Sequence, residues 1–249
     1  MFADMEISYN KFNIPSFFFT AVMMIVLMAS VLPASGKEDW KVVKKKNGII
    51  VKSRKVPFSP LNEGKAECVI NSSIEAVYDI IKDPSTYNNW FAFCAESRVI
   101  EKIDENTNIV YQVANLPFPL QDMDSIIVFH TNEMFESDQA IIEINLLPDH
   151  QAVKYHMDEI TRNNNRMRVK AYYFTFFLDR ISPSRTKVVY MAGGDPGAPV
   201  PKWVLNMFSS IQSLKSLEGL REEVKKRELM LFNPVNREPR GLLLQDRSG

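Results

Sequence analysis

The stretch GGDPGAPVPKW, residues 193–203, marks the point where this chain changes from strand-like to helical sequence. Its three glycines and three prolines predict an abrupt turn. Pro201 suits the first turn of a helix, where a missing N–H removes no hydrogen bond. Between Pro201 and about Arg227, apolar residues recur at helical spacing and predict one long amphipathic helix: Trp203, Met207, Phe208, Ile211, Leu214, Leu217, Leu220 and Val224.

The sequence before this turn, from Trp40 to Tyr190, is typical of an antiparallel meander. Asn47-Gly48 predicts a two-residue hairpin turn between short apolar runs. Clusters of turn-forming residues then separate one strand-like run from the next, at 104–106, 136–138, 148–150, 163–165 and 182–184. Closely spaced strands that are joined by tight turns pair antiparallel.

One short helix interrupts the strands. Ser72 and Glu75 have the spacing of a capping box, in which the two residues satisfy each other's backbone donors. The helix that follows ends before Pro84, and a further helical turn is expected up to Trp90. Its apolar residues are Ile74, Val77, Tyr78 and Ile81.

Alternation of apolar and polar residues assigns an inner face to each strand. The predicted inner residues are Ala66, Cys68 and Ile70; Ile142, Ile144 and Leu146; Val153, Tyr155 and Met157; Met167, Val169, Ala171 and Tyr173; and Thr186, Val188 and Tyr190. The apolar stripe of the long helix must be buried, and the sheet is the one large partner that the sequence offers. We therefore predict an α+β fold, a strongly curved antiparallel sheet with the C-terminal helix across its concave face.

A sheet that closes around a helix can leave a long apolar cavity between the two. The alternative is that the facing residues only pack a core, as apolar stripes usually do. Gly193, Gly194 and Gly197 are the positions expected to let the helix tilt as a lid. The residues expected to line the cavity are Tyr155, Met157, Met167, Val169, Tyr173, Val188 and Tyr190 from the sheet, with Met207, Phe208, Ile211 and Leu214 from the helix.

Residues 1–36 are predicted to be a cleaved secretory signal peptide. Ile14–Leu32 is a run of 19 residues without a charge, and the small residues Ala34 and Gly36 follow it as a cleavage site. The alternative is an uncleaved membrane anchor, which the lysines between 37 and 46 favour by the positive-inside rule. Cleavage would place the domain, residues 37–228, in the periplasm or outside the cell. Residues 229–249 are expected to form a loosely held tail.

The composition contains little that indicates catalysis or nucleic-acid binding. The formal net charge is +0, so bulk electrostatics would not hold the protein on the phosphates of a nucleic acid. This balance does not exclude a local basic patch. Two alternatives remain for Cys68 and Cys94: they form a disulfide, or they stay as two free thiols. We interpret His130, His150 and His156 as surface or strand-end residues, and predict no catalytic residue and no metal site.

Five stretches, taken in this order and spacing, resemble a START domain, the lipid-transfer family with the helix-grip fold that is related to steroidogenic acute regulatory protein. The first four are Trp40 with Ile49-Ile50-Val51-Lys52-Ser53-Arg54; Ser73 to Tyr78 with Asp83 and Trp90; Ser97 to Glu101 with Val110-Tyr111; and Pro117 to Asp124. The fifth runs from Tyr190 to Asn206 and resembles the segment that leads into the C-terminal helix of the family.

The sequence departs from the family pattern at two positions. Met123 stands between Asp122 and Asp124 where the family often has arginine, and Phe91 follows Trp90 where it often has aspartate. The resemblance implies that one sterol or lipid binds in the cavity, that the C-terminal helix and nearby loops act as a lid, and that no cofactor is needed.

We therefore expect a monomer that binds a single lipid or sterol-like molecule and makes transient contact with membranes, between which it can carry the ligand. The first alternative is an enzyme on the same fold, similar to polyketide cyclases or hydrolases of the wider superfamily, which would need polar residues inside the cavity. The second is a membrane-anchored interaction protein whose groove is filled by its own side chains, so that the cavity would be too small for a ligand.

Overall fold

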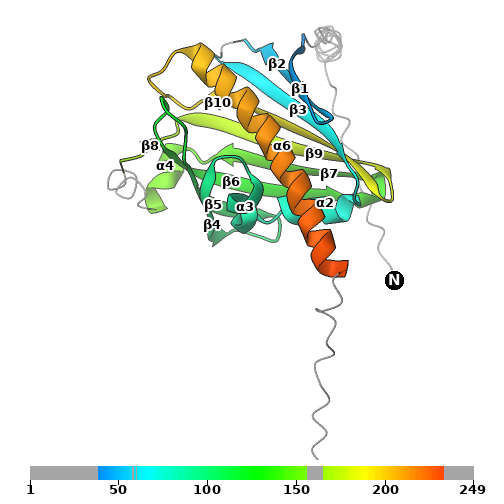
Figure 1. Cartoon of the computed structure of the whole chain (residues 1–249). Helices are drawn as coiled ribbons and strands as arrows, with labels where there is room; N and C mark the ends of the chain where they lie inside the picture. Colours follow the sequence, from blue (N-terminus) through cyan, green and yellow to red (C-terminus); the bar gives the residue numbers. More distant parts are fainter. Residues whose placement is uncertain (1–38, 58, 60, 156–164, 233–249) are drawn as a thin grey trace, which may run out of the picture. The chain divides into compact units, whose positions relative to one another are not determined.

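The computed structural model describes residues 39–57, 59, 61–155 and 165–232 (Figure 1). The predicted signal peptide, Met157 and most of the predicted tail lie outside this part of the chain. Within it, no helix combines the length and the apolar character needed to cross a bilayer.

Ten strands of the described residues form one sheet in the order β1-β2-β3-β10-β9-β7-β6-β5-β4, and β8 pairs with β6. Neighbouring strands are antiparallel except for the short parallel β6–β8 pair. The strands are β1 (Lys41–Lys46), β2 (Ile49–Lys55), β3 (Asn62–Ile70), β4 (Cys94–Lys102), β5 (Thr107–Ala114), β6 (Met123–Met134), β7 (Gln139–Leu146), β8 (Met167–Arg168), β9 (Ala171–Ser182) and β10 (Arg185–Asp195).

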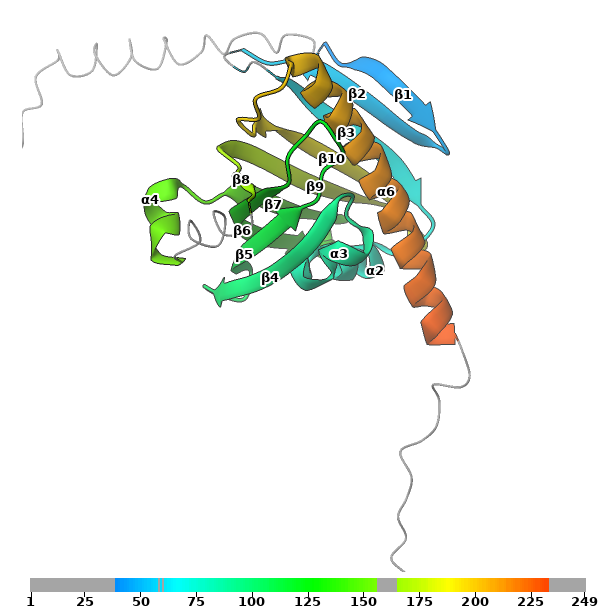
Figure 2. The ribbon, with the colours of Figure 1, turned by 60° about the vertical axis from the view of Figure 1, so that its left-hand side comes forward.

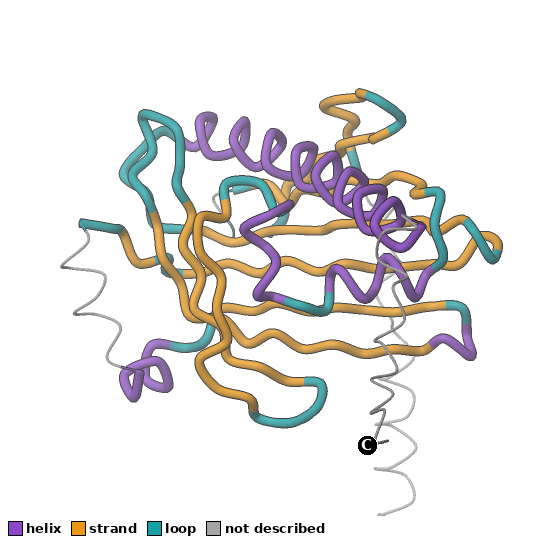
Figure 3. The backbone as a smooth tube through the Cα atoms, turned by 60° about the horizontal axis from the view of Figure 1, so that its bottom comes forward, coloured by secondary structure: helices purple, strands orange, loops and turns teal. Residues whose placement is uncertain are grey.

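The longest helix, α6 (Lys202–Phe232), lies across one face of this sheet, and the short helices α2 (Ile74–Ile81) and α3 (Tyr87–Trp90) lie on the same side (Figures 1 and 3). α6 contacts β2, β3 and β10 and also α2 and α3 (Figure 2). The remaining helical turns are η1 (Pro84–Thr86), η2 (Phe135–Ser137), α4 (Asp149–Ala152) and η3 (Val153–Tyr155). The structure thus confirms the α+β fold, with a helix laid across an antiparallel sheet.

Several local predictions are confirmed. Asn47 and Gly48 have φ angles of 51° and 72°, as a hairpin turn between β1 and β2 requires. α2 ends before Pro84 and α3 ends at Trp90. The inner residues predicted for three strands are buried or packed against the core: Ala66, Cys68 and Ile70 of β3, Ile142, Ile144 and Leu146 of β7, and Thr186, Val188 and Tyr190 of β10.

Two strand predictions are wrong. Residues 149–155 form the helical turns α4 and η3, so Val153 and Tyr155 do not belong to a strand. In the next segment the alternation is interrupted between β8 and β9, where the Lys170 N–H donates to the Pro196 carbonyl. This interruption moves the faces by one residue, because alternation holds only along an unbroken strand. Ala171 is therefore exposed and Tyr173 half-buried, while Tyr172, Phe174 and Phe176 face the core.

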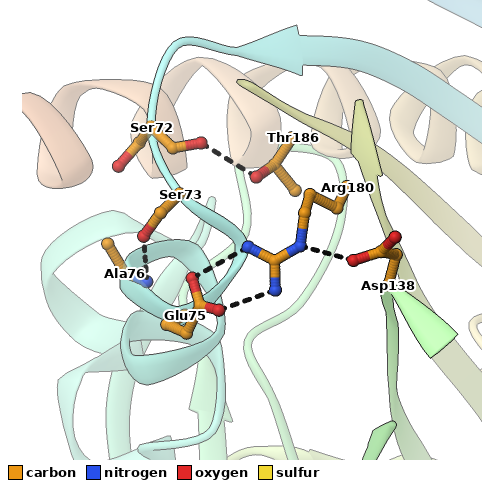
Figure 4. Close-up of polar contacts among 7 residues, drawn as sticks. All are labelled: Ser72, Ser73, Glu75, Ala76, Asp138, Arg180 and Thr186. Atoms are coloured by element: carbon orange, nitrogen blue, oxygen red, sulfur yellow. Dashed lines mark hydrogen bonds and ion pairs between the residues drawn. The ribbon is translucent and has the colours of Figure 1, made fainter. Parts of the chain in front are cut away.

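The start of α2 also differs from the predicted capping box. The capping residue is Ser73, whose Oγ accepts from the Ala76 N–H at 3.3 Å. Glu75 instead receives two hydrogen bonds from the Arg180 guanidinium, which also donates to Asp138 (Figure 4). The pKa of Glu75 is lowered, mainly by its bonds to Arg180. The ion pairs of Arg180 with Glu75 and with Asp138 tie the beginning of α2 to β9 and to the β6–β7 turn.

The long helix runs past the predicted boundary at residue 228, to Phe232, and only part of its predicted stripe is buried. Leu214, Leu217, Leu220 and Val224 belong to the main core. Trp203 and Met207, by contrast, are 66% and 52% exposed. The first turn packs Val204 and Leu205 against loop residues rather than against the sheet, which rotates the buried face at this end of the helix.

Candidate functional site

A cavity of about 150 Å³ lies between the sheet and the first turns of α6. Its walls come from the α3–β4 connection, β5, the β5–β6 loop, the β8–β9 connection, the end of β10 and α6. The lining is Leu61, Asn62, Phe91, Ala92, Cys94, Gln112, Val113, Ala114, Leu116, Leu120, Met123, Asp124, Ser125, Val169, Tyr172, Tyr190, Ala192, Gly193, Gly194, Pro196, Leu205, Asn206, Phe208, Ser209 and Gln212.

Some of the residues expected from the sequence are in this lining and others are elsewhere. Val169, Tyr190 and Phe208 line the cavity, as do Gly193 and Gly194. Val188 and Leu214 are buried in the main core instead. The others lie outside the lining: Ile211, Met167 and Tyr173 are half-buried, Met207 is exposed, and Tyr155 packs in a second cluster behind β5 and β6. Met157 lies outside the described residues.

The lining residues that the sequence did not predict come mainly from loops and from the ends of strands. Phe91 and Met123, the two positions where the chain departs from the family pattern, are both buried and both line the cavity. That departure was the one signal that could have identified them. Leu116, Leu120 and Ala92 belong to connections, where no periodicity assigns a face.

One wall of the cavity is aromatic. The Phe91 ring stacks on that of Phe174 with centroids 5.0 Å apart, and it meets the Tyr190 ring at 6.0 Å. Tyr190 also packs on Phe176 at 5.0 Å. Ring pairs at these distances add to the energy of burial and fix the shape of this wall.

Part of the lining is polar. Tyr172, whose ring stacks on Phe174 at 5.5 Å, donates its O–H to Gln112 Oε1 at 3.1 Å. Asp124 pairs with Val113 of β5, so its side chain stands on the other face of the sheet from Gln112. It is fully buried and accepts from Arg168 Nε at 2.7 Å and from the Tyr111 O–H at 3.1 Å. Because the carboxylate and the guanidinium balance each other, the pair adds no net charge.

A small apolar group borders the cavity at the first turn of α6, and we call it the mouth cluster; it consists of Leu61, Leu120, Val204 and Leu205. It joins the β2–β3 connection, the β5–β6 loop and the first turn of α6. A hydrogen bond from the Asn62 N–H to Asn206 Oδ1, 3.1 Å long, links β3 to the same turn. The Phe93 ring also packs on that of Phe208 with centroids 4.8 Å apart, so the beginning of α6 is held by contacts outside the main core.

The three glycines predicted as a hinge have different environments. Gly193 and Gly194 lie in β10, paired with Tyr173 and Tyr172 of β9. A Cβ on Gly194 would lie 2.5 Å from the Ala171 carbonyl oxygen, so this glycine allows close strand approach. Gly197 follows β10, has a φ of +79°, and donates its N–H to Asp195 Oδ1 at 2.8 Å. Of the three, Gly197 is the one outside the sheet.

The cysteines are free thiols, both buried. Cys94 lines the cavity, and burial raises its pKa to about 12, so its reactive thiolate is scarce at neutral pH. No histidine occurs among the described residues of the lining, and no group of three or more metal-binding side chains occurs in the described part of the chain. These walls can enclose an apolar molecule, but they do not place a nucleophile beside a base.

Comparison with known proteins gives consistent matches. The START domain family model matches residues 26–228. Human START domain-containing protein 10 is 22% identical over 166 residues, which cover 64% of this chain and 54% of that protein. The chain thus spans about half the length of this relative. Rat phosphatidylcholine transfer protein is 21% identical over 175 residues, which cover 70% of this chain and 78% of that protein.

A solved structure supports the fold. The STAR-related lipid transfer protein from Xanthomonas axonopodis superposes with a TM-score of 0.64 at 19% identity, covering 75% of this chain and 98% of that chain. The family match extends over most of the sequence and includes the elements that enclose the cavity. On this evidence, the chain belongs to the START domain family.

Proposed function

We propose that this protein binds a single lipid or sterol-like molecule in the cavity beneath α6 and exchanges it with membranes. The observation that carries the proposal is the cavity itself, which is apolar along most of its wall and bordered by the mouth cluster. Two similar proteins support the proposal: the rat protein is named for phosphatidylcholine transfer, and the Xanthomonas axonopodis protein is named for lipid transfer.

The size of the cavity sets a condition on binding. A volume of about 150 Å³ holds a group the size of one small ring. Pockets for larger ligands are usually about 300–1,000 Å³. A whole lipid therefore requires the walls to move apart, and the mouth cluster is separate from the main core that holds the later part of α6. Displacement of the first turns of α6 would both admit the ligand and enlarge the space.

The membrane contact is proposed to lie at this mouth. Phe118, in the loop that carries Leu120, is 96% exposed. Trp203, next to Val204 on α6, is 66% exposed. Large apolar side chains on two segments that meet in one cluster form a surface suited to the interface of a bilayer.

The test is native mass spectrometry of the protein purified gently from its host, followed by extraction and by incubation with vesicles of phosphatidylcholine and cholesterol. The proposal expects one small molecule per chain, lost on denaturation, or the uptake of one from the vesicles. A bare protein mass together with no uptake would overturn it and favour the interaction protein with a filled groove.

An enzyme on the same fold is not favoured by the described lining. The Cys94 thiol stays protonated, and Asp124 is engaged by Arg168 and Tyr111. A hydrolase or cyclase needs a group free to take or give a proton at the substrate. The proposal therefore assigns the polar lining residues Gln112 and Tyr172 to ligand binding and not to catalysis.

We also propose export, with cleavage near Gly36, on the strength of the apolar run Ile14–Leu32 and the small residues after it. The intact mass of protein isolated from its host tests this. A chain that begins near Lys37 in a soluble fraction is expected. The full-length mass in the membrane fraction would contradict export and support the anchor.

A further inference from the structure

Three buried side-chain atoms of the described residues lack a hydrogen-bond partner: Trp90 Nε1, Ser97 Oγ and Gln112 Nε2. Gln112 is the one of these residues that lines the cavity. Its side chain belongs to β5 and the residue is 6% exposed, so water does not readily replace the missing partner. An unsatisfied buried donor costs about 1–3 kcal/mol, and folded proteins rarely retain one without a reason.

The orientation of the Gln112 carboxamide is fixed from one side. Its Oε1 accepts the Tyr172 O–H at 3.1 Å. Burial raises the pKa of Tyr172 far above its usual value, so this hydroxyl keeps its proton. With the oxygen end occupied, the amide group at the other end supplies the two N–H donors that remain.

The protein offers three polar side chains near this amide. Ser97 pairs with Gln112 across the β4–β5 ladder, and Ser125 pairs with it across the β5–β6 ladder, so all three side chains stand on the same face of the sheet. The Ser97 hydroxyl has no partner either, and Ser97 is not part of the cavity lining. Cys94 lines the cavity with Gln112, and its thiol interacts with the Gln112 side chain. Cys94, Ser97 and Ser125 are therefore the competitors that any experiment on Gln112 must control.

The charges around the cavity restrict what the free amide can bind. Among the described lining residues, Asp124 is the one charged side chain, and it is paired with Arg168. No lysine, arginine or histidine of the described chain lines the cavity. A phosphate or carboxylate placed here would be buried without a counterion, which is strongly unfavourable. A neutral oxygen does not carry this cost.

We propose that Gln112 Nε2 is the polar anchor of the cavity, and that it donates to one uncharged oxygen of an otherwise apolar ligand. The oxygen is that of a ketone, an ester or a hydroxyl group. This inference rests on the proposed function and narrows its ligand to neutral molecules, with any phosphate or carboxylate kept outside the cavity.

The test uses probes small enough for the cavity as it stands, so that it does not depend on lipid uptake. Acetophenone carries a carbonyl oxygen, isopropylbenzene has nearly the same shape without it, and benzoate carries a charge. Calorimetric titration of the intact protein is expected to show acetophenone binding about fivefold to tenfold more tightly than isopropylbenzene. Benzoate is expected not to bind at pH 7.

The variants separate the anchor from its neighbours. Gln112→Leu should remove the preference for acetophenone and leave the binding of isopropylbenzene nearly unchanged. Cys94→Ala, Ser97→Ala and Ser125→Ala should each keep the preference. A second measurement needs no variant, because the Gln112 side-chain amide signal in a ¹⁵N NMR spectrum should shift with acetophenone and not with isopropylbenzene.

Equal affinities for the two neutral probes, a preference that survives in Gln112→Leu, or one that is lost in Cys94→Ala, Ser97→Ala or Ser125→Ala would overturn the proposal. The two proposals fail separately. A preference for acetophenone without uptake of any lipid would keep the anchor and remove the lipid carrier. Lipid uptake without that preference would keep the carrier and remove the anchor.

Discussion

Single atoms decide how closely α6 approaches the rest of the molecule. A Cβ on Gly219 would lie 2.1 Å from the carbonyl oxygen of Trp90, at the end of α3. Glycine in the middle of a helix costs about 1 kcal/mol relative to alanine. The close contact between α6 and α3 is therefore obtained at the expense of helix propensity.

Gly219→Ala is expected to lower the free energy of unfolding by about 1–3 kcal/mol, because overpacking outweighs the gain in propensity. Urea unfolding measures the change. Gly64→Ala is the control, since its added Cβ would meet Ser209 Oγ at 3.3 Å, an atom at the end of a side chain that can rotate. A stabilised Gly219→Ala variant would show that propensity dominates and that the contact is loose.

The Cys94 thiol makes stability depend on pH in the alkaline range. Its pKa is raised from 9.0 to about 12 by burial, so the folded protein holds this proton more tightly than the unfolded chain. The contribution is complete below pH 9 and is lost as the pH rises toward 12. Urea unfolding at pH 8, 9 and 10 should give a steeper loss of stability for the native sequence than for Cys94→Ala. Equal slopes would contradict the raised pKa.

At the scale of elements, α6 has two differently held halves. Its later part, with Leu214, Leu217, Leu220 and Val224, is in the main core, whereas its first turn is held by the mouth cluster. Local openings follow such differences in packing, and segments with few buried contacts open first. The helix is therefore expected to open over the cavity at its N-terminal end.

Two equal substitutions test this asymmetry. Val204→Ala removes apolar contact from the mouth cluster, and Val224→Ala does so in the main core; neither residue lines the cavity. Each should cost about 1–3 kcal/mol of stability. Only Val204→Ala is expected to speed the transfer of a fluorescent sterol between vesicles, severalfold. If both variants transfer at the same rate, α6 does not open at its beginning.

At the scale of the whole molecule, the cavity mouth and the exposed apolar side chains come together. Phe118 and Trp203 belong to segments that are far apart in the sequence and that meet in the mouth cluster. A carrier must open where it touches the membrane, because an apolar ligand crossing water would lose its favourable burial.

Phe118→Ser and Trp203→Ser are therefore expected to reduce sedimentation with phosphatidylcholine vesicles and the rate of sterol transfer severalfold, with little change in unfolding. Ile181→Ser is the matched control, since Ile181 is 49% exposed at the end of β9 remote from Tyr172. An equal effect of all three variants would show that exposed apolar area in general, and not the mouth, drives membrane contact.

Most elements, and their order along the chain, could be predicted from the sequence, although residues 149–155 are helical and not the predicted strand. The hairpin at Asn47-Gly48, the short helix before Pro84, the strands with an unbroken alternation and the long helix after Pro201 all depend on signals within a few residues. Local backbone preference and apolar periodicity are written directly in the chain, and antiparallel pairing follows from tight turns.

Which side chains surround the cavity follows from the packing of the whole fold. Because of the interruption between β8 and β9, Tyr172 lines the cavity in place of Tyr173; Phe91 and Leu120 come from loops, and Met123 from the start of β6. Gln112 lies among apolar residues near the end of β5, and the residues beside its side chain, Tyr172 and Ser97, come from other strands. Because a cavity is formed by segments distant in the chain, its lining depends on how they pack, and a shift of one residue reverses every face.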